Sequence, residues 1–256
     1  MIKKAFTLTE MLVTISITSL VMAVMMPAFA RSRAEGRSIV CTSNLRQLVV
    51  AVQSYACDND DYYPIAYVRD PNPEDSLAVY NYWDFAYTKN GDTGEVKIKP
   101  GLLWRGQTNS KIQQCPSFKG NANSSDPYTG YNYNTSFIGH GSNEALVKPA
   151  RISQVRKPAQ CAIFGDGEYI DGANKFMRAP FKTSTTYFAF QTAGTQGYRH
   201  SGATNVAWCD GHASSQKELY TDTDESGGKE KLEQYNQTAK VKVGFLSPDN
   251  SAYDLE

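Results

Sequence analysis

The sequence predicts an α+β protein in which one long N-terminal helix packs on an antiparallel β-sheet head. An apolar run starts at Phe6, and apolar residues at helical spacing follow it as far as Tyr55. It then changes to short strand-like runs separated by Gly, Pro, Asn and Ser. At 256 residues and 41% hydrophobic content, the chain is long enough for one sizeable core. We therefore expect one folded head plus an anchor.

The first element is predicted to be a membrane span. A short basic leader, residues 1–5, precedes residues 6–30, which are apolar apart from hydroxyls and one carboxylate, Glu10. About 20 apolar residues cross a bilayer as a helix. The alternative is a secretory signal peptide, cleaved after the Ala-Phe-Ala of residues 28–30. Glu10 argues against it, because a carboxylate is costly in hydrocarbon and has no use in a peptide that is removed.

The same helix is predicted to continue through residues 31–57, where apolar side chains form a stripe at helical spacing. The members of this stripe are Cys41, Leu45, Leu48, Val52 and Tyr55. The polar residues placed off the stripe are Arg37, Asn44, Arg46 and Gln53. We expect this stripe to pack under the head.

A proline interrupts the predicted helix. From Phe6 to about Ala56 the helix would have some 51 residues and span roughly 77 Å. Pro27 has no amide hydrogen, and its ring clashes with the carbonyl one turn back. We therefore expect a kink or local melting around Ala23 to Pro27.

Residues 4–10, Lys-Ala-Phe-Thr-Leu-Thr-Glu, resemble the cleavage and methylation signature of type IV prepilins and type II secretion pseudopilins. The resemblance implies that a prepilin peptidase cuts between Ala5 and Phe6, that the new amine of Phe6 is methylated, and that the span is retained. Pro27 matches the position where these families have a helix-loosening proline. Ala5 departs from the usual Gly, and because it is also small we expect slower cleavage at worst.

The resemblance also implies a pilin-like fold and a role in assembly. Residues 6–30 would lie in the membrane or filament core, and residues 58–256 would form the extracytoplasmic head. Glu10 would pair with the amine of Phe6 on an adjacent subunit, which favours polymer over monomer. The alternative is a protonated Glu10. The implied partners are prepilin peptidase, other pilin or pseudopilin subunits and an inner-membrane assembly platform.

The implied location is the bacterial inner membrane, crossed once, with the head in the periplasm or at the cell exterior. Arg31, Arg33 and Arg37 follow the span on this outer side, against the positive-inside tendency. We still place the head outside because Lys3 and Lys4 precede the span and a processed pilin leader stays cytoplasmic.

The head is predicted to begin at residue 58, where the turn formers Asp58-Asn59-Asp60-Asp61 are expected to end the helix. The segment from Thr221 to Lys231, charged and Gly-containing, is expected to be flexible. Strand-like runs are predicted at Cys161–Phe164, Tyr187–Gln191, Asn205–Cys209 and Lys240–Phe245.

His200 is followed, after nine intervening residues, by Asp210-Gly211, which resembles the H-X9-DG motif that accompanies prepilin-type leaders in a large family of bacterial proteins. Gly202 is predicted to supply the turn of a hairpin here. We expect His200 to bond a backbone or carboxylate group near Asp210. Three further segments resemble that family: residues 41–48, residues 115–117 and residues 162–167.

The cofactor prediction is limited to one ion. Asp166 and Asp210 each precede a Gly at a predicted strand end and could supply oxygen ligands for calcium, an ion that some pseudopilin heads bind. His200, Asp210 and Ser201 could be cast as a hydrolytic site, but no G-x-S-x-G elbow or other activated nucleophile supports it. The sequence therefore does not predict an enzyme.

Charge and cysteine content exclude other classes. The 26 Lys and Arg balance the 26 Asp and Glu, so nothing predicts a nucleic-acid partner. The five cysteines form no C-x-x-C pair, which makes a zinc ribbon improbable. In an exported chain one or two disulfides are possible, with buried free thiols as the alternative, and the sequence does not give the connectivity.

Two functions follow from these patterns. The first is a structural subunit of a pseudopilus or pilus. The second is a membrane-anchored binding module that does not polymerise and whose tyrosine-rich loops hold a glycan or another ligand. Glu10 separates them, because a filament needs this carboxylate and a simple anchor does not.

Overall fold

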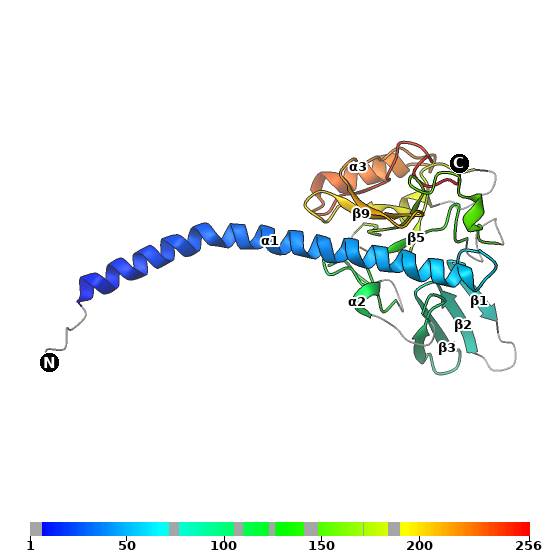
Figure 1. The fold of residues 1–256 in the computed structure, drawn as a ribbon, viewed down its shortest axis with the longest axis horizontal. Helices are drawn as coiled ribbons and strands as arrows, with labels where there is room; N and C mark the ends of the chain where they lie inside the picture. Colours follow the sequence, from blue (N-terminus) through cyan, green and yellow to red (C-terminus); the bar gives the residue numbers. More distant parts are fainter. Residues whose placement is uncertain are drawn as a thin grey trace.

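The computed structural model describes residues 7–71, 77–104, 110–122, 126–140, 148–170, 172–183 and 190–256. One long helix leads into an α+β head, as Figure 1 shows, which confirms the predicted fold class. Helix α1 spans Leu8–Cys57, 50 residues, or about 75 Å at 1.5 Å per residue. The leader and the predicted cleavage position, residues 1–6, lie outside the described residues.

Helix α1 does not break at Pro27. It is α-helical from end to end, so the expected local melting around Ala23 to Pro27 is wrong. Pro27 removes one hydrogen bond, but the helix continues on both sides of it, and none of the described head residues packs against this segment to force a break. Instead the N-terminal half of the helix curves gently (Figure 1), which is how long helices relieve small strains.

The helix ends at the predicted turn. Asp58 caps it, and its amide bonds back to the Tyr55 carbonyl at 3.1 Å. Asp60 and Asp61 then take left-handed backbone angles, with φ of 52° and 61°. Aspartate tolerates this region better than most residues because its short side chain bonds locally, so the chain can reverse here towards the head.

The C-terminal half of α1 presents the predicted stripe to the head. Cys41, Leu45, Leu48 and Val52 are buried, and Tyr55 is half-buried. The placement of Asn44 off the stripe is wrong. This side chain is buried, and its amide donates to the Lys111 carbonyl at 2.9 Å and to the Tyr131 hydroxyl at 3.3 Å. A polar residue is accepted there because these partners satisfy it.

A five-stranded sheet lies against this face of α1. Its order is β10-β9-β6-β5-β7, and all its pairs are antiparallel except β5 with β7. The strands are β5 (Asn132–Asn134), β6 (Ala162–Gly165), β7 (Phe176–Met177), β9 (Thr204–Trp208) and β10 (Ala213–Gln216). Helix and sheet share one core, in which Tyr133 and Phe164 stack with ring centroids 5.0 Å apart.

A second sheet, β1-β2-β3-β4, forms an antiparallel meander that the sequence analysis did not predict. Figure 1 shows β1, β2 and β3 on the side of α1 away from β9. Trp83 and Phe85, at the β2–β3 connection, are buried, and Trp83 joins the core. The strands are β1 (Tyr67–Pro71), β2 (Leu77–Tyr82), β3 (Phe85–Asn90) and β4 (Val96–Pro100).

The remaining elements complete the head. They are α2 (Ser110–Gln113), η1 (Ile152–Gln154), η2 (Gln191–Gly194), β8 (Gln196–Gly197), α3 (Gly228–Thr238) and β11 (Val243–Gly244), with β8 paired to β11. The expected flexibility from Thr221 to Lys231 is wrong. Glu225 accepts hydrogen bonds from the Thr192 backbone and hydroxyl, α3 begins at Gly228, and buried Leu232 anchors that helix.

The four strands predicted from the sequence agree with the structure to different extents. β6 and β9 confirm those at Cys161–Phe164 and Asn205–Cys209, while Lys240–Phe245 contains only the short β11. The strand predicted at Tyr187–Gln191 lies mostly outside the described residues, and its last residue, Gln191, starts the 3-10 turn η2.

The shared core predicts how truncation affects folding. A chain starting near Arg31 keeps the whole buried stripe and should be soluble and unfold cooperatively in urea. A chain that also lacks residues 31–55 exposes the sheet face beneath α1 and should aggregate. Size-exclusion chromatography and urea titration check both, and a well-behaved shorter chain would show that α1 is not part of the core.

Candidate functional site

The N-terminal half of α1 is an apolar surface that packs against no other segment that the structure describes. All side chains from residue 7 to residue 33 are exposed, among them Leu8 at 84% and Met26 at 71%. This half contains a window long and apolar enough to cross a membrane. Burying such a surface requires lipid or other subunits.

The hydroxyls in this half do not prevent its burial in hydrocarbon. Thr14, Ser16 and Ser19 donate to the carbonyls of Met11, Leu12 and Ile15 at 2.7–2.8 Å. Thr18 bonds back in the same way, at 2.9 Å to the Thr14 carbonyl. Because each of these four hydroxyls is satisfied by its own helix, the segment carries few polar groups that demand water.

Glu10 closes the N-terminus of α1 in a capping box with Thr7. The Thr7 amide and hydroxyl donate to Oε2 of Glu10 at 2.8 Å and 2.6 Å, and the Glu10 amide donates to Oγ1 of Thr7 at 3.3 Å. This arrangement satisfies amides that a helix start otherwise leaves without partners. The sequence analysis missed this role, although the T-x-x-E spacing signals it.

The other assembly and processing residues predicted from the sequence fall into two groups. Pro27 lies within α1 and is exposed. Ala5 and Phe6, the predicted cleavage and methylation positions, lie outside the described residues.

The head holds a buried polar cluster around His200. The backbones of His200 and Ala203 exchange two hydrogen bonds at 3.0 Å and 3.1 Å across a two-residue turn. Ser201 and Gly202 in the turn have φ of 55° and 81°, as a type I′ hairpin requires. The predicted turn at Gly202 is confirmed, and it fixes His200 opposite Ala203, the residue before β9.

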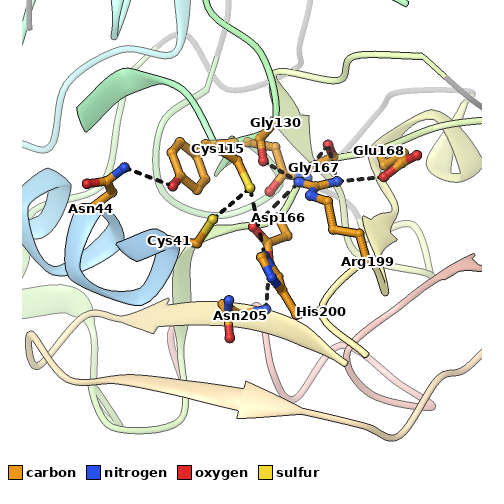
Figure 2. Close-up of polar contacts among 12 residues, drawn as sticks. Cys41, Asn44, Cys115, Gly130, Asp166, Gly167, Glu168, Arg199, His200 and Asn205 are labelled. Carbon is orange, nitrogen blue, oxygen red and sulfur yellow. Dashed lines mark hydrogen bonds and ion pairs between the residues drawn. The ribbon is translucent and has the colours of Figure 1, made fainter. Parts of the chain in front are cut away.

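Asp166, at the end of β6, is the centre of this cluster (Figure 2). Its Oδ2 accepts from the Asn205 amide at 2.7 Å and from Nε2 of His200 at 3.1 Å, while Oδ1 meets Arg199 at 3.5 Å. Arg199 also binds Glu168 at 2.6 Å. All four charged side chains are at least 96% buried, so each depends on the others for compensation.

The cluster shifts the ionisation of His200. Burial lowers the pKa of this imidazole, but the hydrogen bonds with Asp166 and Cys115 outweigh it, and the pKa is raised to about 9. Burial likewise lowers the pKa of Arg199, and the charges of Asp166 and Glu168 raise it above its ordinary value. Both side chains are therefore cations at neutral pH.

Two thiols border the cluster. Cys41 of α1 and Cys115, just after α2, place their Sγ atoms 2.8 Å apart, and Nε2 of His200 lies 3.8 Å from Sγ of Cys115. Ligand atoms of Cys41, Cys115, Asp166 and His200 all lie within 4.8 Å of one another, a set that could hold a metal ion. The sequence analysis missed this set because its members come from four separate segments.

The cluster is not arranged as a hydrolytic triad. Such a triad uses one imidazole nitrogen for the nucleophile and the other for the carboxylate. Here Nε2 of His200 faces both Cys115 and Asp166, and Nδ1 has no partner among the described residues. Ser201 lies in the exposed hairpin turn.

The expected pairing of His200 near Asp210 is wrong, because His200 pairs with Asp166 instead. Asp210 follows the far end of β9, where Oδ1 meets Nδ1 of His212 at 2.6 Å. Gly211 takes a φ of 97°, which explains a glycine at this turn. The structure therefore does not bring Asp166 and Asp210 together as calcium ligands.

Comparison with known proteins gives one match. Residues 1–26 match the family described as the prokaryotic N-terminal methylation motif. No curated protein and no solved structure matches the chain.

The motif and the exposed apolar helix support a prepilin-type, pilin-like protein. Both features fit a single-pass inner-membrane anchor. The motif implies processing by a prepilin peptidase and assembly with other pilin subunits.

The raised pKa of His200 predicts a pH dependence of stability. The imidazole pKa is about 9 in the folded chain and roughly 6.5 when unfolded. Its contribution is complete below about pH 6.5 and is lost as the pH rises through about 9. The free energy of unfolding should fall by on the order of 2 kcal/mol across this window.

Urea titrations of the detergent-solubilised chain, kept reduced so that the Cys115 thiol is present, measure this fall at several pH values. His200→Gln should remove most of it, whereas His212→Gln, which changes an exposed imidazole, should keep it. An equal fall in both variants would assign the pH dependence to other groups.

Proposed function

We propose that the protein is a structural pilin or pseudopilin subunit, processed by prepilin peptidase and assembled into a type II secretion pseudopilus or a type IV pilus-like filament. The observation that carries the proposal is the N-terminal half of α1, an exposed apolar helix with one carboxylate near its start and a methylation motif over residues 1–26. Lipid can cover this surface before assembly and neighbouring helices can cover it afterwards. The H-X9-DG resemblance at His200 and Asp210-Gly211 extends the proposal to the head.

Cleavage between Ala5 and Phe6 prepares the subunit for assembly. It removes the two leader lysines and leaves a positive amine on Phe6, methylated in the mature chain. Glu10 of a neighbouring subunit then supplies the opposite charge. Because an unpaired charge in a low-dielectric layer is expensive, the pair forms only when subunits stack in the correct axial register.

The head would lie outside the inner membrane, with the assembly platform drawing processed subunits from the bilayer. The three arginines that follow the span are exposed: Arg31, Arg33 and Arg37. They can meet lipid headgroups on the outer side before a subunit enters the filament.

A second candidate is the membrane-anchored binding module, and one observation favours it. One face of the β1–β4 sheet carries a ladder of half-buried tyrosines, with Tyr80 and Tyr87 stacked at 4.5 Å and Tyr67 beside Tyr82 at 4.8 Å. Such rings can stack against sugars or a neighbouring subunit. These tyrosines lie on strands, not on the tyrosine-rich loops expected from the sequence.

Processing gives the most direct test. The mature protein isolated from membranes should begin at Phe6 with a methylated amine. Intact-mass and N-terminal peptide analysis by mass spectrometry check this. A chain that retains Met1, or one that starts near Arg31, would contradict the prepilin assignment.

Glu10→Gln tests assembly separately from helix capping. Glutamine can still close a capping box with Thr7 but carries no charge for the Phe6 amine. Since an uncompensated buried charge costs more than about 1.4 kcal/mol, the ratio of assembled to membrane-bound processed subunit should fall at least about tenfold. Quantification of sheared filaments or crosslinked multimers measures the ratio.

Thr7→Val is the matched control for this variant. It removes the hydroxyl that caps α1 and keeps the charge of Glu10. Assembly should stay close to that of the unmodified chain once it is normalised to processed subunit. Undiminished assembly of Glu10→Gln would limit Glu10 to processing or capping and favour the binding module.

A further inference from the structure

Two buried sulfur atoms from distant parts of the chain lie unusually close together. Sγ of Cys41 on α1 and Sγ of Cys115 in the head are 2.8 Å apart, and both residues are fully buried (Figure 2). Non-bonded heavy atoms settle at about 3.5–4.0 Å, whereas bonded sulfurs lie about 2.05 Å apart. Two separate thiols are therefore crowded at this distance. The five cysteines are free thiols in the structure.

We propose that Cys41 and Cys115 form a disulfide in the exported protein, which fastens α1 covalently to the head. The two thiols release two protons and two electrons as their S–S bond forms. A disulfide of a dithiol oxidase or of oxidised glutathione accepts them and becomes two thiols. The step requires an oxidising compartment, so it rests on the extracytoplasmic location in the proposed function.

The backbone around Cys115 holds its sulfur in place. The Cys115 amide donates to the Thr129 carbonyl at 3.1 Å, and its carbonyl accepts from the Phe118 amide at 3.1 Å. Gly130, at a φ of 100°, packs so closely that an added Cβ would lie 2.7 Å from Cβ of Cys115. Because the loop cannot relax away from α1, the two sulfurs stay together in the folded head.

A zinc ion fits this geometry less well. Zn–S bonds of about 2.3 Å in a tetrahedron place two sulfurs about 3.8 Å apart, roughly 1 Å more than the distance found. Asp166, the nearest carboxylate, already accepts from Asn205, His200 and Arg199. A metal would have to displace some of these donors.

Charge balance also favours the disulfide. Two carboxylates, Asp166 and Glu168, face two cations, Arg199 and His200, so this buried cluster is neutral without the sulfurs. A zinc ion bound by two thiolates and a neutral His200 would leave it with an excess negative charge, and so would a lone thiolate. A disulfide adds no charge and keeps the cluster balanced.

The other cysteines do not compete for this pair. Cys57 is exposed at the C-terminal end of α1, about 24 Å along the helix from Cys41. Cys161 and Cys209 adjoin each other across β6 and β9, where the Cys209 amide donates to the Cys161 carbonyl at 3.0 Å. The structure thus supplies the connectivity that the sequence does not.

The position of the bond suggests its purpose. Cys41 is the first buried residue of α1, at the point where the helix leaves the head. Any pull between an anchored helix and the head acts first at this point. A covalent bond here would resist peeling of α1 from the sheet.

Peptide mapping tests the pairing on the full chain. Cells are lysed in N-ethylmaleimide, and the protein is purified in detergent and digested without reductant. We expect the Cys41 and Cys115 peptides joined to each other and separated by reductant, with Cys57 alkylated. Recovery of both Cys41 and Cys115 as alkylated peptides, or stoichiometric zinc by elemental analysis, would overturn the disulfide in the exported protein.

A second arm separates this failure from failure of the proposed location. The purified, reduced chain is incubated with oxidised glutathione and mapped again. If the pair forms here but not in cells, the extracytoplasmic head is wrong and the pairing geometry is right. If it forms in neither, the pairing itself is wrong.

Thermal unfolding gives an independent readout. Because the bond closes a loop between residues 74 positions apart, dithiothreitol should lower the Tm of the unmodified chain by roughly 10 °C. Cys57→Ser should keep this response, and the double variant Cys41→Ser with Cys115→Ser should lose it. A response unchanged in the double variant would contradict the proposal. If that variant does not fold, the peptide map of the unmodified chain still decides.

Discussion

The packing of one face of α1 on the five-stranded sheet is the constraint on which the rest of the structure depends. From Cys41 onward the helix contributes a buried stripe to the core, and before that residue none of its side chains is buried. A single continuous helix therefore has two environments. Its C-terminal half is stabilised by the head, and its N-terminal half, apolar on all sides, requires lipid or other subunits. A rigid connection between the two lets the head fold independently of what surrounds the anchor.

In the head, buried ion pairs connect short strands that share few backbone hydrogen bonds. β5 and β7 have only a few backbone hydrogen bonds between them. Next to β7, Lys175 is buried against Asp84 and lies 3.3 Å from Asp126, which links the β2–β3 connection to this sheet. Asp166, which directly follows β6, also links this strand to β9, because its carboxylate accepts from the Asn205 amide of β9 and pairs with Arg199. Removing one member leaves a buried charge without compensation, so these clusters specify the arrangement more than they add net stability.

The parts of the structure that the sequence predicted depend on local patterns. The length of α1, its buried stripe, β6, β9 and the turn at Gly202 all follow from residue spacing or turn chemistry. The missed parts depend on long-range contacts. Asn44 is polar, so the sequence predicts that its side chain is exposed. Its burial depends on the Lys111 carbonyl and the Tyr131 hydroxyl, which are distant in the sequence. Likewise His200 has Asp210 as its nearer acidic neighbour along the chain, yet the β6–β9 pairing delivers Asp166. The Cys41–Cys115 contact could not be predicted from the sequence either, because the two residues are 74 positions apart.

The capping box changes how Glu10 is understood. From the sequence alone, a carboxylate in an apolar helix predicts a partner on another molecule. Here Thr7, at the start of the same helix, already provides hydrogen-bond donors for Glu10. The Thr7 amide and hydroxyl both donate to Oε2 of Glu10. A carboxylate has a second oxygen, so Oε1 can accept an ammonium group from a neighbour while Oε2 keeps the cap. In the proposed filament, the cap would fix the direction of the carboxylate before assembly and so lower the entropy lost when the pair forms. Capping and the proposed pairing with a neighbouring amine are therefore compatible in one side chain: capping needs its hydrogen-bonding oxygens, and pairing needs its charge.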